Sequence, residues 1–224
     1  MRNNEKRSKI IIELAGKLPV FTFDDFTGIE RDRHYLWLIL HRYEKSGKLL
    51  RLKRGIYTTT AYVEKMKNRG EIEVFLDFLA NFLYSPSYLS LETILYRHNI
   101  LTEIPVNLTS VTKNKTAAFT NKLGNFLYHK IKPSLFFGFE VSEEGDFSFR
   151  KATKAKALFD FLYLRKNILP SKEAVKELRL NLEHLSRADI NELKKYVALE
   201  GSKKMKELLN YLFDPVRSPA AEKT

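Results

Sequence analysis

Residues 31–57 read RDRHYLWLILHRYEKSGKLLRLKRGIY, and this stretch decides the fold expected for the N-terminal part of the chain. Its first half spaces apolar side chains by three and four positions, the period of one buried helix face. Those side chains are Leu36, Ile39, Leu40 and Tyr43. Gly47 stands where the C-terminus of a helix favours a left-handed residue. The pattern therefore predicts a helix that begins at Asp32 and ends before Gly47.

The second half of the stretch predicts a β-hairpin with a basic tip. Apolar and polar residues alternate over Leu49–Leu52 and again over Ile56–Thr59, and Lys53, Arg54 and Gly55 separate the two runs. A helix followed at once by a basic hairpin is the sequence form of a winged helix-turn-helix. Such a module places one helix in the major groove of DNA and lays its hairpin on the backbone.

The preceding residues supply the other two helices of such a module. Residues 5–16, EKRSKIIIELAG, predict a first helix, and three of its aliphatic side chains should face inward. These are Ile10, Ile11 and Leu14. Thr22 is expected to cap a short second helix, because Asp25 follows three residues later and an acid favours a helix N-terminus. Phe23 and Phe26 should then face the core.

Charge is concentrated in this N-terminal part. The chain has 224 residues and a net charge of +12, and residues 1–70 carry 16 Lys and Arg against 8 Asp and Glu, which gives +8. Residues 71–224 carry 23 against 19, which gives +4. A basic N-terminal module is expected if it meets phosphates. Scattered surface lysines on an ordinary soluble protein are the alternative explanation.

Seven residues are therefore candidates for DNA contact. They are Arg31, Arg33, His34 and Trp37 at the helix, and Arg51, Lys53 and Arg54 in the hairpin. Arg33, His34 and Trp37 lie on the helix face opposite Leu36, where arginine can read guanine and tryptophan can meet a thymine methyl. Arg31 precedes the helix and is expected to contact the backbone. The alternatives are that Trp37 packs between domains and that the hairpin cations are only solvated.

The residues needed for several other classes of protein are missing from the sequence. The chain has no cysteine, which excludes disulfides, cysteine-ligated zinc and thiol catalysis. The N-terminus makes a poor signal peptide because Glu13 interrupts its short apolar run. No run approaches the roughly 18 apolar residues of a membrane span. We therefore expect a cytoplasmic protein with no membrane contact, no cofactor and no metal site.

The rest of the chain predicts a larger α+β unit. Residues 60–70 are polar and are expected to link the two parts, and residues 72–84 predict a buried helix that Pro86 ends. Ser90 should cap the next helix. Residues 106–150 are rich in β-formers and predict four or five strands of an antiparallel or mixed sheet. Helices are then expected at 153–166, 171–181, 187–199 and 202–213, and Asp214 with Pro215 should end the last.

The fold class expected is α+β, with an N-terminal winged helix-turn-helix over residues 1–70. A larger α+β domain with a mixed or antiparallel sheet, flanking helices and a helical C-terminal part should follow over 71–214. Residues 215–224 should form a flexible tail. The 44% hydrophobic content is enough for packed cores in both domains.

Four segments together resemble the AbiEi family of type IV antitoxins. They are RLKRGIY at Arg51–Tyr57, SPSYLSLETILYRHNIL at Ser85–Leu101, LTSVTKNKT with FLYHKIKPSLFFGFE ending at Glu140, and ATKAKALFDFLYL at Ala152–Leu164. Ile94 stands where the family usually has alanine. The resemblance covers about residues 5–170, and its strength lies in the order of the four segments, since no single motif is decisive.

This resemblance implies two roles and two partners. One is repression of the chain's own promoter, with double-stranded DNA bound at inverted repeats, and dimerisation on DNA is left open. The other is neutralisation of a nucleotidyltransferase-like toxin through the second domain. Lys156 and Asp160, four residues apart on a helix, match the family motif and have either a structural role or a toxin contact.

We expect no enzymatic activity. The five histidines show no metal-site spacing, and no phosphate-binding loop or nucleophile elbow is present. Gly201 and Ser202 followed by Asp214 faintly resemble nucleotidyltransferase elements, but two acids are normally needed, and a helix end followed by a helix start explains the pair better. A winged-helix regulator with a ligand-sensing second domain is the main alternative, and a nuclease is a further one.

Overall fold

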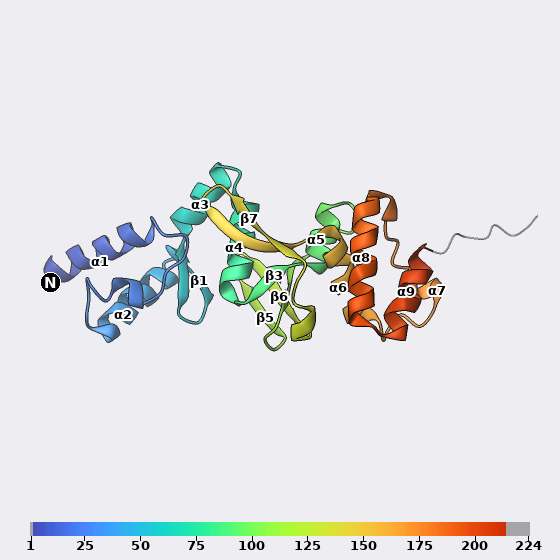
Figure 1. Ribbon diagram of the computed structural model, residues 1–224. Coiled ribbons are helices and arrows are strands. Elements are labelled where there is room, and N and C mark those ends of the chain that lie inside the picture. The colour runs from blue at the N-terminus through green and yellow to red at the C-terminus, as the bar shows by residue number, and fades with distance from the viewer. Residues whose placement is uncertain (1, 214–224) are drawn as a thin grey trace, which may run out of the picture.

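The computed structural model describes the backbone of residues 2–213 and the side chains from Arg7 onward. The molecule is elongated and α+β (Figure 1), as expected: α1, α2 and a two-stranded hairpin lie at one end, a mixed sheet lies in the middle, and α6, α8 and α9 lie at the other end. Asp214 and Pro215, expected to end the last helix, and the expected tail at 215–224 lie outside the described residues.

The N-terminal elements follow the order expected from residues 31–57. They are α1 (Arg2–Ala15), the 3-10 turn η1 (Asp24–Phe26), α2 (Arg33–Lys45), β1 (Leu49–Lys53) and β2 (Ile56–Thr59). The side chain of Asp32 caps α2 by accepting from the backbone N–H groups of His34 and Tyr35. Gly47 has φ of 74° after the helix, and Gly55 has φ of 79° at the hairpin tip. Local residue choice thus explains both boundaries.

Two details of this part differ from expectation. The second helix is only a 3-10 turn, although Asp25 does accept hydrogen bonds from the backbone N–H and the hydroxyl of Thr22. In α1, Ile11 and Ala15 are buried, while Ile10 and Leu14 are each 38% exposed. The run of three isoleucines made the inward face ambiguous, because successive helix residues lie about 100° apart.

A small core holds these elements together. Its buried members are Ile11, Ala15, Phe21, Phe26, Leu36, Ile39, Leu40, Leu49 and Tyr57. Phe21 forms a bridge with Tyr57, and each backbone N–H donates to the other's carbonyl at 2.9 Å. The two rings stack with centroids 6.0 Å apart. Tyr57 is therefore structural, and it joins the hairpin to the chain between α1 and η1.

The link expected at residues 60–70 is the helix α3 (Thr60–Asn68), and it packs against the larger part of the molecule. Its polar appearance is one-sided, because Tyr62, Val63 and Met66 are buried. These three side chains share one hydrophobic core with Phe75 of α4 (Ile72–Leu83). The larger core thus begins before residue 70.

The larger part is built on a six-stranded mixed sheet, which agrees with the antiparallel or mixed sheet expected. Its strands are β3 (Ser87–Leu89), β4 (Asn107–Thr112), β5 (Ala117–Asn121), β6 (Gly124–Lys130), β7 (Phe139–Glu144) and β8 (Phe147–Ala152). Their order is β5-β6-β4-β3-β8-β7, with β4–β6 and β3–β8 parallel and the other neighbours antiparallel. The short β3 was not expected, because three residues carry no readable alternation.

Helices complete this part. Those after the sheet are α6 (Lys154–Arg165), α7 (Lys172–Lys176), the 3-10 turn η3 (Leu182–His184), α8 (Arg187–Glu200) and α9 (Lys203–Phe213). α5 (Leu91–Arg97) packs on α6. Gly201 ends α8 with φ of 80°, and the hydroxyl of Ser202 accepts from the backbone of Met205. The pair Gly201–Ser202 is therefore a helix end followed by a helix start, as expected.

The sequence left open a structural role or a toxin contact for the pair Lys156–Asp160. Both side chains are 0% exposed in the structure. Ser90 precedes α5, yet its hydroxyl caps nothing and donates to Asp160 instead. A partner protein cannot touch side chains that are fully covered, so this pair has a structural role.

Candidate nucleic-acid interface

The exposed face of α2 carries a stack of three rings. Trp37 is 46% exposed, and its ring lies nearly parallel to that of His41, with centroids 5.0 Å apart and planes 10° apart. The ring of His34 also stacks on that of Trp37, with centroids 6.1 Å apart and planes 23° apart. The alternative that Trp37 packs between domains does not fit this exposure. The stack therefore places aromatic surface on the outside of the protein, where a ligand can reach it.

Two arginines stand at the beginning of this face. Arg33, the first residue of α2, donates to the carboxylate of Asp24 in η1 at 2.7 Å. Both side chains are more than 70% exposed, and such pairs contribute little because water competes for each charge. Arg31 is exposed just before the helix. Arg33 can therefore exchange Asp24 for a phosphate or a base at small cost.

The hairpin presents two of its three expected cations to solvent. Arg51 and Arg54 are exposed, but Lys53 is only partly so. The ammonium of Lys53 donates to the carbonyl of Leu83 at 3.0 Å and lies 4.4 Å from the ring centroid of Phe119. The structure thus places Lys53 against the larger part of the molecule, unlike the solvent-facing position expected.

Three further members of this surface were not among the candidates predicted from the sequence. Leu38 is 40% exposed beside Trp37, and Arg42 and Lys45 are exposed in the last turn of α2. Leu38 belongs to the continuous apolar run YLWLIL, so its exposure could be inferred only from the helical angle that separates it from Leu36 and Ile39. Aliphatic groups on such a surface suit contact with thymine methyl groups.

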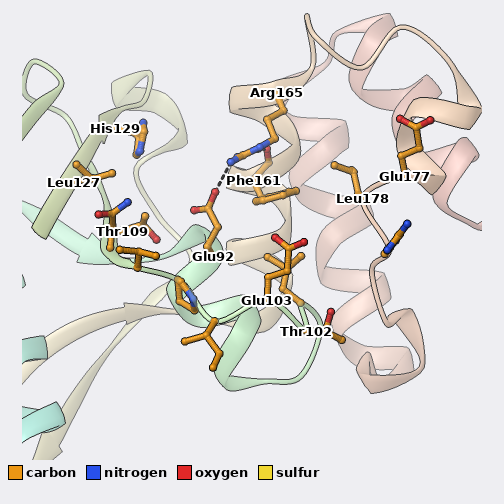
Figure 2. A pocket seen from close by; sticks show the side chains of 16 residues that line it. Glu92, Thr102, Glu103, Thr109, Leu127, His129, Phe161, Arg165, Glu177 and Leu178 are labelled. Carbon is orange, nitrogen blue, oxygen red and sulfur yellow. Dashed lines mark hydrogen bonds and ion pairs between the residues drawn. The ribbon is translucent and has the colours of Figure 1, made fainter.

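A groove lies in the larger part of the molecule, far along the chain from α2. It measures about 1040 Å³ and lies between α5, α6, β6 and the segments at 101–107 and 177–179. Figure 2 shows Glu92 and Arg165 reaching toward each other beside it. The guanidinium of Arg165 lies 3.8 Å from the ring centroid of Phe161. The size suits a small ligand.

The walls of this groove mix charge and apolar surface. Glu103 and Glu177 contribute acids and Arg179 a base, while Ile104 and Val106 on its edge are 75% and 85% exposed. Burial lowers the pKa of the nearby His129, and the charge of Arg165 acts in the same direction. Arg179 also has a positive φ of 48°. A mixed lining of this kind selects no single ligand class.

Metal and membrane features are not found in the described part of the chain. Among residues 2–213, no three side chains of His, Asp or Glu gather closely enough to hold a metal ion. No helix within the same residues is both long and apolar enough to cross a membrane.

The N-terminal segment is similar to a family of transcriptional regulators. Residues 9–60 match the family described as "Transcriptional regulator, AbiEi antitoxin". The matched segment runs from the middle of α1 to the first residue of α3, so it covers the exposed face of α2 and the hairpin. No curated protein matches the chain. The family expected from the sequence is thus confirmed for this segment, and the resemblance of the three later segments stays an expectation.

Proposed function

We propose that this chain is a DNA-binding autorepressor and antitoxin, with a winged helix-turn-helix formed by α1, η1, α2 and the β1–β2 hairpin. The observation that carries the proposal is the combination of one helix with an exposed aromatic and basic face and a hairpin with exposed arginines. In a winged helix these two features meet the groove and the backbone respectively. The matched regulator family supports the same assignment.

We place the boundary of the DNA-binding module at residues 59–60, earlier than the expected residue 70. The small core ends with Tyr57 of β2, whereas Tyr62 and Met66 of α3 pack into the larger core. A module cut at residue 70 would therefore carry a helix whose apolar face has lost its partner.

The DNA contacts proposed are those that the structure leaves accessible. They are Arg31, Arg33, His34, Trp37, Arg51 and Arg54. Arg51 and Arg54 should meet phosphates, and each phosphate contact contributes about −0.9 to the slope of log affinity against log salt concentration. A pair of chains on an inverted repeat would double the slope of one chain.

The test is a salt titration of the full chain on its own promoter DNA and on a scrambled duplex. Replacing Arg51 and Arg54 together with alanine should flatten the slope by about 1.8 on both DNAs, because two phosphate contacts are lost. Changing Lys67 and Lys203 to alanine is the matched control, since both carry exposed charges and belong to α3 and α9, not to the hairpin. An unchanged slope in the arginine variant would show that the hairpin does not meet the backbone.

We further propose that the larger part neutralises a nucleotidyltransferase-like toxin. Support for this half comes from the antitoxin description of the matched family and from the resemblance of the later segments. A growth assay with an inducible toxin, run beside a promoter reporter, separates the two roles. The Arg51→Ala/Arg54→Ala variant should lose repression and keep rescue. Loss of both at normal protein levels would contradict a division of labour.

A ligand-sensing regulator is the second candidate function, and the groove beside Arg165 favours it. A ligand in this groove changes operator affinity only if it binds more tightly to one of two conformations that differ in their affinity for DNA. Arg165→Ala would remove one of the groove's cations and its contacts with Glu92 and Phe161. Operator affinity that responds to small metabolites in the wild type, but not in Arg165→Ala, would favour this function over the antitoxin.

A further inference from the structure

The basic tip of the hairpin is fastened to the larger part of the molecule through Lys53. Its ammonium donates to the carbonyl of Leu83, the last residue of α4. The last carbonyls of a helix have no partner within the helix, and a cation there also complements the helix dipole. Lys53 therefore supplies α4 with a C-terminal hydrogen bond from an element 30 residues earlier in the chain.

Two aromatic rings also contact this ammonium, and we call the carbonyl of Leu83 together with the rings of Tyr84 and Phe119 the seat of Lys53. Its nitrogen lies 4.4 Å from the ring centroid of Phe119 on β5 and 5.4 Å from that of Tyr84. The two rings meet edge to face at 5.7 Å, and the hydroxyl of Tyr84 donates to the carbonyl of Lys115. Cations are attracted to the faces of aromatic rings. The rings are thus held by contacts that do not involve Lys53.

A second contact attaches β1, the strand that contains Lys53, to the sheet. The side-chain amide of Asn121, at the end of the edge strand β5, donates to the carbonyl of Leu52 at 3.1 Å. The side chain of Leu52 is 2% exposed and belongs to the larger core. Backbone and side chains of β1 are therefore both attached to the sheet.

An irregularity in the hairpin explains why Lys53 and Arg51 point to different places. Side chains alternate along a regular strand, so residues 51 and 53 would share a face. The pairing register shifts between them, with Arg51 opposite Tyr57 and Lys53 opposite Ile56. Such a bulge redirects a side chain. Arg51 stays in solvent while Lys53 turns to the sheet.

We propose that Lys53 is a positioning residue that fixes the angle of the hairpin against α4 and β5, and that operator affinity depends on this seat although Lys53 does not touch DNA. The proposal rests on the proposed DNA binding and adds a route for its regulation. A change at the end of α4 or at β5, such as one caused by a partner of the larger part, would alter the hairpin and thereby the operator affinity.

The test compares three single variants in the full chain. Lys53→Met keeps the aliphatic stem and removes the charge, Phe119→Leu removes the ring from the seat, and Arg54→Met is the matched loss of an exposed cation at the neighbouring position. Lys53→Met should lose on the order of tenfold in operator affinity, the equivalent of one hydrogen bond, without changing the salt slope. Arg54→Met should flatten the slope by about 0.9 on operator and random DNA alike.

The double variant Lys53→Met/Phe119→Leu gives the decisive comparison. If both residues act through one seat, the double variant should lose no more operator affinity than the worse single variant, because interacting sites are not additive. Hydrogen exchange of the hairpin amides, residues 49–59, should rise in Lys53→Met and in Phe119→Leu but not in Arg54→Met. This exchange does not depend on DNA and shows whether the seat holds the hairpin in any variant that stays folded.

Three results would overturn the proposal. A flattened salt slope in Lys53→Met would make Lys53 a phosphate contact. Unchanged operator affinity or unchanged hairpin exchange in Lys53→Met would show that the seat positions nothing that DNA binding needs. If the wild-type chain bound its promoter no better than scrambled DNA, the proposed DNA-binding function itself would fail, and that outcome is distinct from the other two.

Discussion

The ammonium nitrogen of Lys156 lies 2.6 Å from Oδ1 of Asp160, and both side chains are fully buried. The other oxygen of Asp160 accepts hydrogen bonds from the hydroxyls of Tyr88 and Ser90 at 2.9 and 2.8 Å. Burial and the adjacent carboxylate raise the pKa of Tyr88, so its phenol remains a donor. The ammonium also donates to the carbonyl of Leu135. This network ties α6 to β3 and to the segment before α5.

Breaking this pair should destabilise the fold strongly. Lys156→Met leaves a buried carboxylate without its cation, and such changes cost about 3–5 kcal/mol. Lys156→Met/Asp160→Leu should recover part of that loss, because no charge is left buried, although the hydroxyls of Tyr88 and Ser90 lose their acceptor. Urea denaturation followed by circular dichroism measures both. Lys67→Met breaks an exposed pair with Glu64 and should cost less than about 1 kcal/mol. A double variant as unstable as the single one would contradict the charge explanation.

Removing the acid beside Arg33 should strengthen DNA binding. Asp24 holds the guanidinium at 2.7 Å, so Asp24→Asn weakens the competing partner and removes a negative charge near the proposed phosphates. We expect a several-fold rise in operator affinity.

Arg33→Ala should lose about 1–3 kcal/mol of binding free energy on the operator and much less on random DNA, if Arg33 reads a base. Fluorescence anisotropy with both duplexes measures the four combinations. Equal losses on the two DNAs would make Arg33 a backbone contact.

Trp37 is the single tryptophan of the chain and reports directly on the α2 surface. Because it is 46% exposed, its fluorescence should be readily quenched by acrylamide in the free protein. Saturating operator DNA should reduce that quenching, since the ring would be covered. The Arg51→Ala/Arg54→Ala variant provides the unbound control, because its weaker binding leaves it largely free at the DNA concentration that saturates the wild type. Unchanged quenching on saturated DNA would place the interface elsewhere.

His129 should make the fold less stable as the pH falls below neutral. Burial lowers its pKa in the folded protein, so the unfolded chain binds a proton more readily once the pH drops below the ordinary value of about 6.5. Stability is therefore full above that value and is lost as the pH falls toward the lowered folded pKa. His129→Gln should lose less stability between pH 6.5 and 5. Thermal melting across pH measures the difference, and identical curves below pH 6.5 would contradict it.

Local patterns in the sequence predicted most of the N-terminal part. The period of Leu36, Ile39 and Leu40 and the hairpin around Gly55 appear as expected, and the helix expected from Asp32 begins one residue later, with Asp32 as its cap. Each of these depends on neighbours within one or two turns of chain. The prediction that Ile10 and Leu14 face inward on α1 was wrong, because three consecutive isoleucines do not show which side of the helix faces the core.

The burial of charged side chains could not be predicted in this way. An i, i+4 pair such as Lys156–Asp160 has the same spacing whether it lies in solvent or in a core. Only the arrival of Tyr88 and Ser90, about 70 residues earlier in the chain, provides the donors that let the carboxylate be buried.

The sequence by itself determined most of the elements of this protein, the basic N-terminal module and the family that its residues 9–60 match. Those follow from side-chain periodicity, turn residues and charge, all of which act over short distances along the chain. The tertiary structure alone decided which cations remain available, since Arg54 stays exposed and its neighbour Lys53 binds the end of α4. The reason is that a side chain's partner is set by what packs beside it in space, and for Lys53 that partner lies 30 residues further along the chain.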